Sequence, residues 1–243
     1  MAAFLGKGYA PLPPADKTQL RVRPLPRLHA RCYTARMPTF RYEIQLGRKS
    51  GAVICGVDEA GRGPLAGPVV ACAAILPLTG LSTRLLGALD DSKRLSPEVR
   101  EEIAVKLQVK AIWALGEASV EEIDRFNILR ATFMAMRRAF ESLPVQPSQA
   151  LIDGNMKPGL PCAETTVVEG DHLSYSIAAA SILAKVARDK MMRELHEEHP
   201  RYGWEHNVGY GTAEHRAAIE AYGLTPHHRV SFKPVYEQLS LID

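Results

Sequence analysis

Carboxylate side chains follow three apolar segments of the sequence, each with the length and composition of a buried strand. The acids at these points are Asp58, Glu59, Asp153, Glu169 and Asp171. If the three strands are neighbours in one sheet, the carboxylates crowd together and raise one another's pKa unless a cation neutralises them. Mg²⁺ and Mn²⁺ suit oxygen ligands of this kind. Two such ions can stabilise the attacking and the leaving oxygen of a phosphodiester displacement.

Single acids in such places also have a purely structural interpretation. Asp153 precedes Gly154, and Asp before Gly is common in turns. Asp58 and Glu59 are harder to explain in this way, because successive strand residues point to opposite faces of a sheet. One of the two acids would be badly placed unless the strand ends at Val57, and the nearby glycines permit that ending. A catalytic cluster further requires that the three strand ends meet.

Several side chains near these acids are suited to binding nucleic acid. Gly61 and Gly63 allow a ligand to approach the backbone closely, and Arg62 between them offers a guanidinium for phosphate. Lys93 could neutralise another phosphate, and Tyr210 could stack on a sugar or a base. Each of these residues alone is also typical of an ordinary surface loop.

Two further groups of polar residues favour structural roles. His227 and His228 are adjacent in the sequence and lack the spacing of metal ligands on one face, so we interpret them as capping or polar core contacts. Lys185, Arg188 and Asp189 have helical spacing, which is typical of a charge set within one helix.

The acids depend on a framework of alternating strands and helices. Strands are predicted at residues 53–57, 69–76, 110–115, 150–153 and 165–168, and helices at 97–107, 120–143, 175–196 and 213–222. The first two strands, joined by a short Gly/Pro turn, are expected to form a hairpin. This order predicts an α/β fold with a mixed sheet and flanking helices.

Composition excludes several classes of protein. The chain has 243 residues, of which 46% are hydrophobic and 23% charged, which is the balance of a globular protein. No apolar run is long enough to span a membrane. The four cysteines form no CxxC pair, so we expect free thiols and no zinc ribbon. These features predict a cytoplasmic protein.

The N-terminal part differs in composition from the rest. Ten of the 30 Lys and Arg residues but two of the 27 acids lie in residues 1–50. We predict a basic, Pro-rich extension over residues 1–48, disordered or preceding a true start at Met37, and a catalytic domain over residues 49–243, with ordered structure from about Ala52. The basic segment could bind a polyanion or be an organellar transit peptide.

Residues 56–68 (GVDEAGRGPLAGP) resemble the first signature of the ribonuclease HII family. Further motifs of that family follow in order: Asp91-Ser92-Lys93, Asp153-Gly154-Asn155, Gly170-Asp171, residues 176–185, Arg188-Asp189, Gly209-Tyr210, and His228-Arg229 with Ser231-Phe232. The resemblance implies a ribonuclease H-like mixed β-sheet flanked by helices, with a helical C-terminal part. It implies an endoribonuclease that hydrolyses the RNA strand of RNA–DNA hybrids and nicks duplex DNA 5′ to a single embedded ribonucleotide, leaving 3′-hydroxyl and 5′-phosphate ends.

The resemblance also implies roles for individual residues. The catalytic and metal-binding acids of the family correspond to Asp58, Glu59, Asp153 and Asp171, which would hold two Mn²⁺ or Mg²⁺ ions. The residues implied in substrate binding are Gly61, Arg62 and Gly63 in a loop that senses the ribose 2′-hydroxyl, Tyr210 packed on the sugar, and Lys93 on a phosphate. Glu169 departs from many members, which carry lysine there.

Other interpretations of the sequence stay open at this point. The related ribonuclease HIII has a different first motif and a folded N-terminal substrate-binding domain, for which residues 1–45 lack apolar content. A non-catalytic hybrid-binding module with the same fold is a second alternative, against which the presence of all four acids argues. A third is a metal-dependent nuclease that needs no ribonucleotide. A monomer is the expected state of the protein.

Overall fold

Five strands form one mixed sheet at the centre of the molecule. The computed structural model describes residues 38–50, 52–90, 95–233 and 235, all within the compact unit that spans residues 35–243. The strands are β1 (Ile54–Ala60), β2 (Val69–Ile75), β3 (Ile112–Ala118), β4 (Gln149–Asp153) and β5 (Ala163–Val167). Their order is β3-β2-β1-β4-β5. The β3–β2 and β2–β1 pairs are antiparallel, and the β1–β4 and β4–β5 pairs are parallel. This pairing confirms the predicted mixed sheet and the predicted hairpin of β1 and β2.

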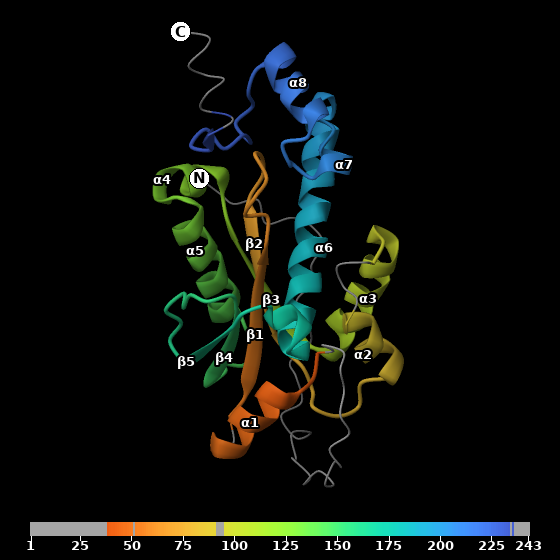
Figure 1. Cartoon of the computed structure of the whole chain (residues 1–243), viewed down its shortest axis with the longest axis vertical. Coiled ribbons are helices and arrows are strands. Elements are labelled where there is room, and N and C mark those ends of the chain that lie inside the picture. Colours follow the sequence, from red (N-terminus) through yellow and green to blue (C-terminus); the bar gives the residue numbers. More distant parts are fainter. Residues whose placement is uncertain (1–37, 51, 91–94, 234, 236–243) are drawn as a thin grey trace. The chain divides into compact units, whose positions relative to one another are not determined.

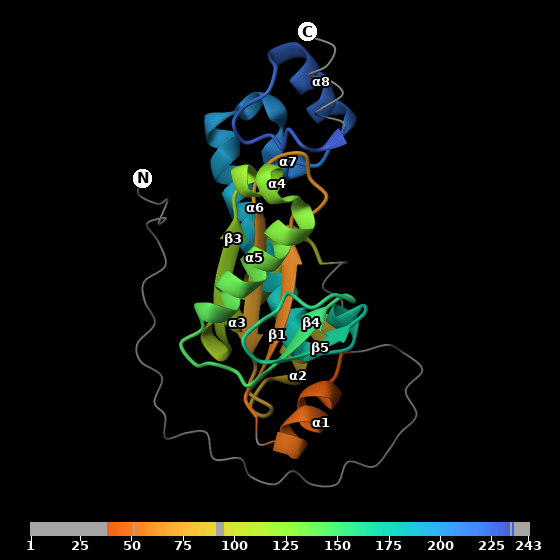
Figure 2. The same cartoon turned by 90° about the vertical axis from the view of Figure 1, so that its left-hand side faces the viewer.

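Helices cover both faces of this sheet (Figures 1 and 2). Their bounds are α1 (Arg41–Ser50), α2 (Thr83–Asp90), α3 (Pro97–Lys110), α4 (Val120–Phe126), α5 (Ile128–Glu141), α6 (Tyr175–Glu198), α7 (Trp204–Asn207) and α8 (Ala213–Tyr222), with short 3₁₀ turns η2 (Gly170–His172) and η3 (Pro200–Tyr202). Helix α5 packs on one face, and α6 packs on the other, with α2 and α3 beyond it. The core therefore lies in two layers, one on each side of the sheet.

Glycine allows the two main helices to approach the sheet closely. A Cβ atom on Gly56 of β1 would lie 2.2 Å from the carbonyl carbon of Ser176 in α6. On the opposite face, a Cβ on Gly116 of β3 would lie 2.2 Å from the carbonyl oxygen of Ala135 in α5. The N-terminal half of α6 presents small buried residues to the sheet, which keeps its axis near the strands.

Ordered structure begins earlier than the sequence predicted. Helix α1 covers residues 41–50, whereas ordered structure was expected from about Ala52. The Glu43 carboxylate is 2% exposed and accepts hydrogen bonds from Ser174 Oγ at 2.7 Å and from Ser176 N at 3.1 Å. A carboxylate at the N-terminus of α6 also interacts favourably with the helix dipole. This tertiary contact stabilises α1, and local sequence does not reveal it. The division of the chain at residues 48 and 49 stays a prediction.

Other differences concern where elements begin and end. Ser119 and Glu122 form a capping box, but the helix that it opens ends at Phe126, whereas one helix was expected over residues 120–143. Asn127 has φ of 69° and caps a separate helix through its Oδ1, which accepts from Leu129 N and Arg130 N. Helix α2 was not predicted.

No described helix is long and apolar enough to cross a membrane. Of the described cysteines, none forms a disulfide.

Candidate active site

Strand β1 continues through the two acids instead of ending before them. The expectation that the strand ends at Val57 is wrong, because β2 goes on pairing with β1 as far as Ala60 opposite Val70. On its other side, β1 pairs with β4 only as far as Val57 opposite Ile152. Asp58 and Glu59 therefore lie inside a strand that extends past its parallel neighbour, and their side chains begin on opposite faces of the sheet.

Asp58 and Asp153 occupy equivalent places on neighbouring parallel strands. The last residues that pair between β1 and β4 are Val57 and Ile152, and Asp58 and Asp153 directly follow them. Side chains at matching positions of parallel neighbours point to the same face of a sheet, so both carboxylates lie on the face that α6 covers. Asp58 is 6% exposed and is hydrogen-bonded to Ser181 of α6. The strand ends thus bring these two acids together, as the sequence analysis required.

The third strand end contributes through the turn that follows it. The backbone N–H of Gly170 donates to Asp153 Oδ1 at 2.7 Å, which attaches η2 to the end of β4. Asp171 is the next residue, is 4% exposed, and has an oxygen 3.8 Å from Nε2 of His172. Glu169, by contrast, is exposed and adopts φ of 54°. Asp58, Glu59 and Asp153, whose charges act on one another, and the predicted fourth acid Asp171 are hereafter called the acid cluster.

Burial and mutual repulsion raise the pKa of two acids in the cluster. Burial raises the pKa of Asp58 well above its usual range, and the charges of Glu59 and Asp153 raise it further. The pKa of Glu59 is also raised by burial, although Arg62 opposes this shift through an ion pair of 3.2 Å. The acid cluster therefore favours either a proton or a cation among its oxygens.

A cleft of about 430 Å³ lies beside the acid cluster. Its lining includes Glu59 and the predicted substrate-binding residues Gly61, Arg62, Gly63 and Tyr210. The Tyr210 ring is close to Gly63, since a Cβ on that residue would lie 3.4 Å from Cε1 of the ring. Tyr210 is 48% exposed, so one side of the ring is open to a ligand. Lys93, the remaining predicted substrate contact, lies outside the described residues.

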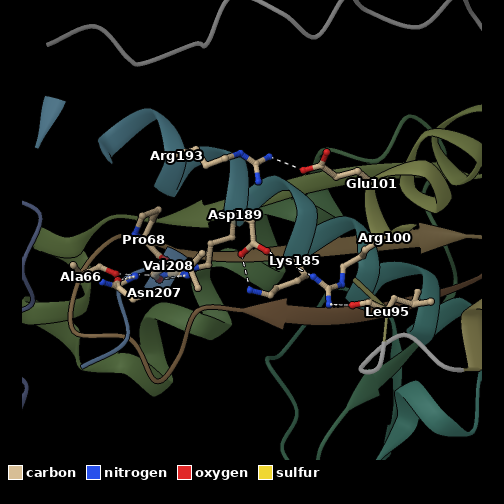
Figure 3. A network of polar contacts seen from close by, with 12 residues as sticks. Ala66, Pro68, Leu95, Arg100, Glu101, Lys185, Asp189, Arg193, Asn207 and Val208 are labelled. Atoms are coloured by element: carbon tan, nitrogen blue, oxygen red, sulfur yellow. Dashed lines mark hydrogen bonds and ion pairs between the residues drawn. The ribbon is translucent and has the colours of Figure 1, made fainter. Parts of the chain in front are cut away.

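The cleft also contains cations and a hydroxyl that the sequence analysis did not assign to the site. These are Arg100, Ser181, Lys185 and Arg188. Lys185 Nζ lies 2.6 Å from Asp189 Oδ1, and Arg100 Nη1 lies 3.9 Å from Asp189 Oδ2 (Figure 3). Lys185 and Asp189 thus pair within one helix, as the predicted charge set of Lys185, Arg188 and Asp189 implied for these two. The spacing of Ser181, Lys185 and Arg188 on one helix was a signal that could have identified this face.

Arg188 does not belong to that charge set. Its buried guanidinium donates to three carbonyl oxygens, Pro68 O at 3.0 Å, Val208 O at 2.9 Å and Ala66 O at 3.0 Å, whose residues lie together in Figure 3. Burial lowers its pKa to about 10, so it stays charged at neutral pH. The predicted intrahelical role of Arg188 is therefore wrong, because α6 directs this side chain toward the β1–β2 loop.

A second buried arginine holds the same loop from the C-terminal side. Arg229 donates to Gly67 O at 2.9 Å, Arg62 O at 3.1 Å, Gly61 O at 2.6 Å and Pro68 O at 3.2 Å. Burial lowers its pKa to about 9. Together, Arg188 and Arg229 fix the peptide planes of residues 61–68, which hereafter are called the glycine loop. Gly61 itself has φ of 97°, in the region that favours glycine.

His228 has the polar core role that the sequence predicted. Its Nε2 lies 3.2 Å from Nε2 of His215, and its Nδ1 accepts from Thr225 N at 2.9 Å. Trp204 Nε1 also donates to His215 Nε2 at 3.0 Å. These contacts fix the segment that carries Arg229 and so support the position of the glycine loop.

The acid cluster has the donor chemistry of a site for hard divalent cations. The ends of β1 and β4 supply carboxylate oxygens, which are the ligands that Mg²⁺ and Mn²⁺ prefer, and Asp171 follows in the turn that is hydrogen-bonded to the end of β4. Burial and the charges of Glu59 and Asp153 raise the pKa of Asp58, so a divalent cation among these oxygens would relieve the crowding. The residues present therefore fit divalent metal ions.

Comparisons with known proteins identify the family of this chain. The Ribonuclease HII family model matches residues 55–235. The chain is 56% identical over 203 residues to ribonuclease HII of Paramagnetospirillum magneticum, covering 84% of this chain and 99% of that protein. It is 54% identical over 200 residues to ribonuclease HII of Rhodospirillum rubrum, covering 82% and 92% of the two chains.

Solved structures show the same fold. Ribonuclease H2 from Pyrococcus horikoshii OT3 is 26% identical and superposes with a TM-score of 0.68 over 77% of this chain and 97% of that one. A structure of Bst-RNase HIII in complex with Mn²⁺ is 19% identical, with a TM-score of 0.62 over 77% and 69% of the two chains. With its acids gathered at the strand ends beside the glycine loop, this chain belongs to the ribonuclease HII family and is a metal-dependent ribonuclease H.

Proposed function

We propose that this enzyme cleaves duplex DNA on the 5′ side of a single embedded ribonucleotide, as well as the RNA strand of RNA–DNA hybrids. The products would carry 3′-hydroxyl and 5′-phosphate ends. The observation that carries this proposal is the adjacency of the acid cluster and the glycine loop, since Glu59 and residues 61–63 line one cleft. Recognition of the sugar and hydrolysis of the phosphodiester would therefore occur within one substrate-binding site.

Asp58, Glu59 and Asp153 would hold the metal ions, with Asp171 completing the set. When bound, two Mn²⁺ or Mg²⁺ ions would supply activation of the attacking water and stabilisation of the leaving 3′-oxygen. The carboxylates themselves are held in place by hydrogen bonds before any metal binds. Asp58 is hydrogen-bonded to Ser181, and its Oδ1 accepts from the N–H of Glu59 at 2.7 Å. Asp153 Oδ1 accepts from the N–H of Gly170. Preorganised ligands of this kind reduce the reorganisation needed during the reaction.

The glycine loop would distinguish ribose from deoxyribose. The carbonyl oxygens of Gly61 and Arg62 both accept hydrogen bonds from Arg229, so the two peptide groups have fixed directions. A fixed backbone can place its polar atoms against a 2′-hydroxyl, the group that separates RNA from DNA. Tyr210 would pack on the sugar at the junction.

Cations around the cleft would bind the phosphates on each side of the cut. Arg62, Arg100 and Lys185 line the cleft, and Lys93 belongs to the same proposed set. Phosphate contacts of this kind position a duplex without reading its sequence. We place the enzyme in the cytoplasm as a monomer, with a catalytic domain that covers residues 49–243 and also includes α1, preceded by a basic segment.

The test uses an end-labelled DNA duplex with one ribonucleotide, beside an all-DNA duplex of the same sequence. With Mn²⁺ or Mg²⁺ we expect a single cut 5′ to the ribonucleotide, no cut in the control, and no cut in EDTA. A continuous RNA–DNA hybrid provides the second substrate. Cleavage of the hybrid alone would overturn the embedded-ribonucleotide part of the proposal, and cleavage of the all-DNA duplex would indicate a nuclease that does not need ribose.

A further inference from the structure

Three potential metal ligands converge outside the candidate active site. Glu198 is the last residue of α6, His199 caps that helix, and His227 comes from the segment after α8. Each offers one ligand atom, and the three atoms all lie within 4.8 Å of one another. The imidazole rings of His199 and His227 have centroids 5.4 Å apart. Two chain segments that are distant in sequence therefore meet at one group of ligands.

The local structure leaves these ligand groups available. Within the described part of the chain, the side chains of Glu198, His199 and His227 make no hydrogen bond or ion pair, whereas the neighbouring His228 has partners at both ring nitrogens. Trp204 packs edge-on against both imidazoles, with centroid distances of 5.8 Å to His199 and 6.2 Å to His227. The rings are thus held in place by packing and not by polar contacts.

The electrostatic setting is suited to a cation. The C-terminal end of a helix carries partial negative charge, and α6, which ends at Glu198, is 24 residues long. Glu198 is exposed, while both histidines are half-buried, so an ion could enter from solvent.

We propose that Glu198, His199 and His227 form a second metal site, selective for Zn²⁺-class ions. Two imidazole nitrogens and one carboxylate oxygen are ligands that Zn²⁺ takes in tetrahedral sites, with a water molecule in the fourth position. Zn–N and Zn–O bonds of about 2.0–2.2 Å place the ligand atoms about 3.4 Å apart, so rotation about side-chain torsions closes the present separations. The acid cluster offers only oxygens and suits Mg²⁺ and Mn²⁺ instead.

Occupancy of this site would connect α6 to the glycine loop. The carbonyl oxygen of His227 accepts from Gly67 N at 2.9 Å, and Arg229 follows two residues later with its own contacts to the loop. A metal bound by His227 therefore fixes the segment that holds the loop, and Zn²⁺ is expected to raise the melting temperature of the folded chain.

The test measures metal binding by the untagged full chain in excess Mg²⁺, which fills the acid cluster. Equilibrium dialysis at micromolar free Zn²⁺ should show one bound equivalent, and Co²⁺ in its place should give the intense visible absorption of four-coordinate cobalt. His199→Ala and His227→Ala should each lose that equivalent and that absorption. His206→Ala is the matched control, because His206 has a side chain 78% exposed and lies outside the three ligands.

Loss of Zn²⁺ binding supports the proposal only if the variant is folded. Circular dichroism and retained cleavage of an RNA–DNA hybrid in Mg²⁺ would show that it is. If His227→Ala does not fold, Glu198→Gln provides the second variant, since Glu198 is exposed at the end of α6. The proposal is overturned if the unaltered chain binds no Zn²⁺ in excess Mg²⁺, or if folded variants bind as much as the His206→Ala control. Both results are independent of the substrate that the enzyme cleaves.

Discussion

Arg229 donates a hydrogen bond of 2.6 Å to the carbonyl oxygen of Gly61, across 168 positions of sequence. The same guanidinium contacts three further carbonyls of the glycine loop, and Arg188 of α6 also donates to carbonyls of this loop. The surroundings of Gly61 have no room for a side chain, because a Cβ at this position would lie 2.0 Å from Nε of Arg188. The geometry of the loop is therefore imposed by two buried charges.

Arg229→Lys tests this relationship. Lysine keeps the charge but cannot reproduce a planar fork of donors, so several carbonyls lose their partner. We expect the free energy of unfolding to fall by about 1–3 kcal/mol. Misplacement of the loop should lower kcat/KM on a single-ribonucleotide duplex by about 10- to 100-fold. Arg193→Lys is the matched control, because Arg193 makes an exposed ion pair with Glu101. Equal effects of the two substitutions would contradict the role of Arg229.

Asp58→Asn should stabilise the metal-free protein. The pKa of Asp58 is raised in the folded state, so its ionisation costs folding free energy once the pH exceeds the unfolded pKa. The stability contributed by the protonated form is present at low pH and is lost as the pH rises through the folded pKa. In EDTA at neutral pH, the variant should gain on the order of 0.5–2 kcal/mol.

The same variant should lose its response to metal. Mn²⁺ should raise the melting temperature of the unaltered chain and have little effect on Asp58→Asn. Asp124→Asn serves as control, because Asp124 accepts hydrogen bonds from Val230 N and Ser231 N and should give no stabilisation when its charge is removed. A fall in the melting temperature of Asp58→Asn in EDTA would oppose the account of crowded acids.

Gly56→Ala should disrupt the packing of α6 on β1. The added methyl would lie 2.2 Å from backbone atoms of Ser176, which cannot move without shifting the helix. We expect a loss of at least about 1–3 kcal/mol in the free energy of unfolding, measured by urea denaturation. Gly87→Ala in α2 meets no atom within 4 Å and should be neutral or stabilising by about 0.5–1 kcal/mol. A Gly56 variant as stable as the Gly87 variant would show that the helix and strand are further apart.

Glu43→Ala should show that α1 is part of the folded domain. The substitution removes the acceptor for Ser174 Oγ and Ser176 N at the start of α6. The expected cost is about 1–3 kcal/mol, because buried donors lose a charged partner. Glu197→Ala, at an exposed position near the other end of α6, should change stability by less than about 0.5 kcal/mol. Thermal denaturation of both variants makes the comparison.

The sequence predicted the sheet well because β1, β2 and β4 contain buried apolar runs, while β3 is largely apolar and β5 ends in β-branched residues. All five strands were expected, and so was the helix over residues 175–196 that corresponds to α6. The ends of elements were less predictable. Strand β1 passes through two acids because β2 continues beside it, and α1 depends on the contact of Glu43 with Ser174. Both facts arise from tertiary pairing and leave no local pattern.

The candidate site was predictable where its acidic residues come directly after apolar strand segments in the sequence. The grouping of Asp58 with Asp153 follows from equivalent positions on parallel strands. Arg188 and Arg229 were missed as loop contacts, because a buried arginine that binds carbonyls looks like any surface arginine in the sequence. His227 likewise gave no metal signal, since its partners Glu198 and His199 lie 28 or more positions earlier.

The most direct test of the central claim compares the unaltered chain with Asp153→Asn on a duplex carrying one ribonucleotide. Cleavage and duplex binding are measured side by side in Mn²⁺ and in EDTA. We expect one cut 5′ to the ribonucleotide by the unaltered chain in Mn²⁺. For the variant we expect a loss of at least about 100-fold in kcat with duplex binding kept, because Asp153 would act on the metal and not on the substrate. Undiminished cleavage by Asp153→Asn would contradict the account.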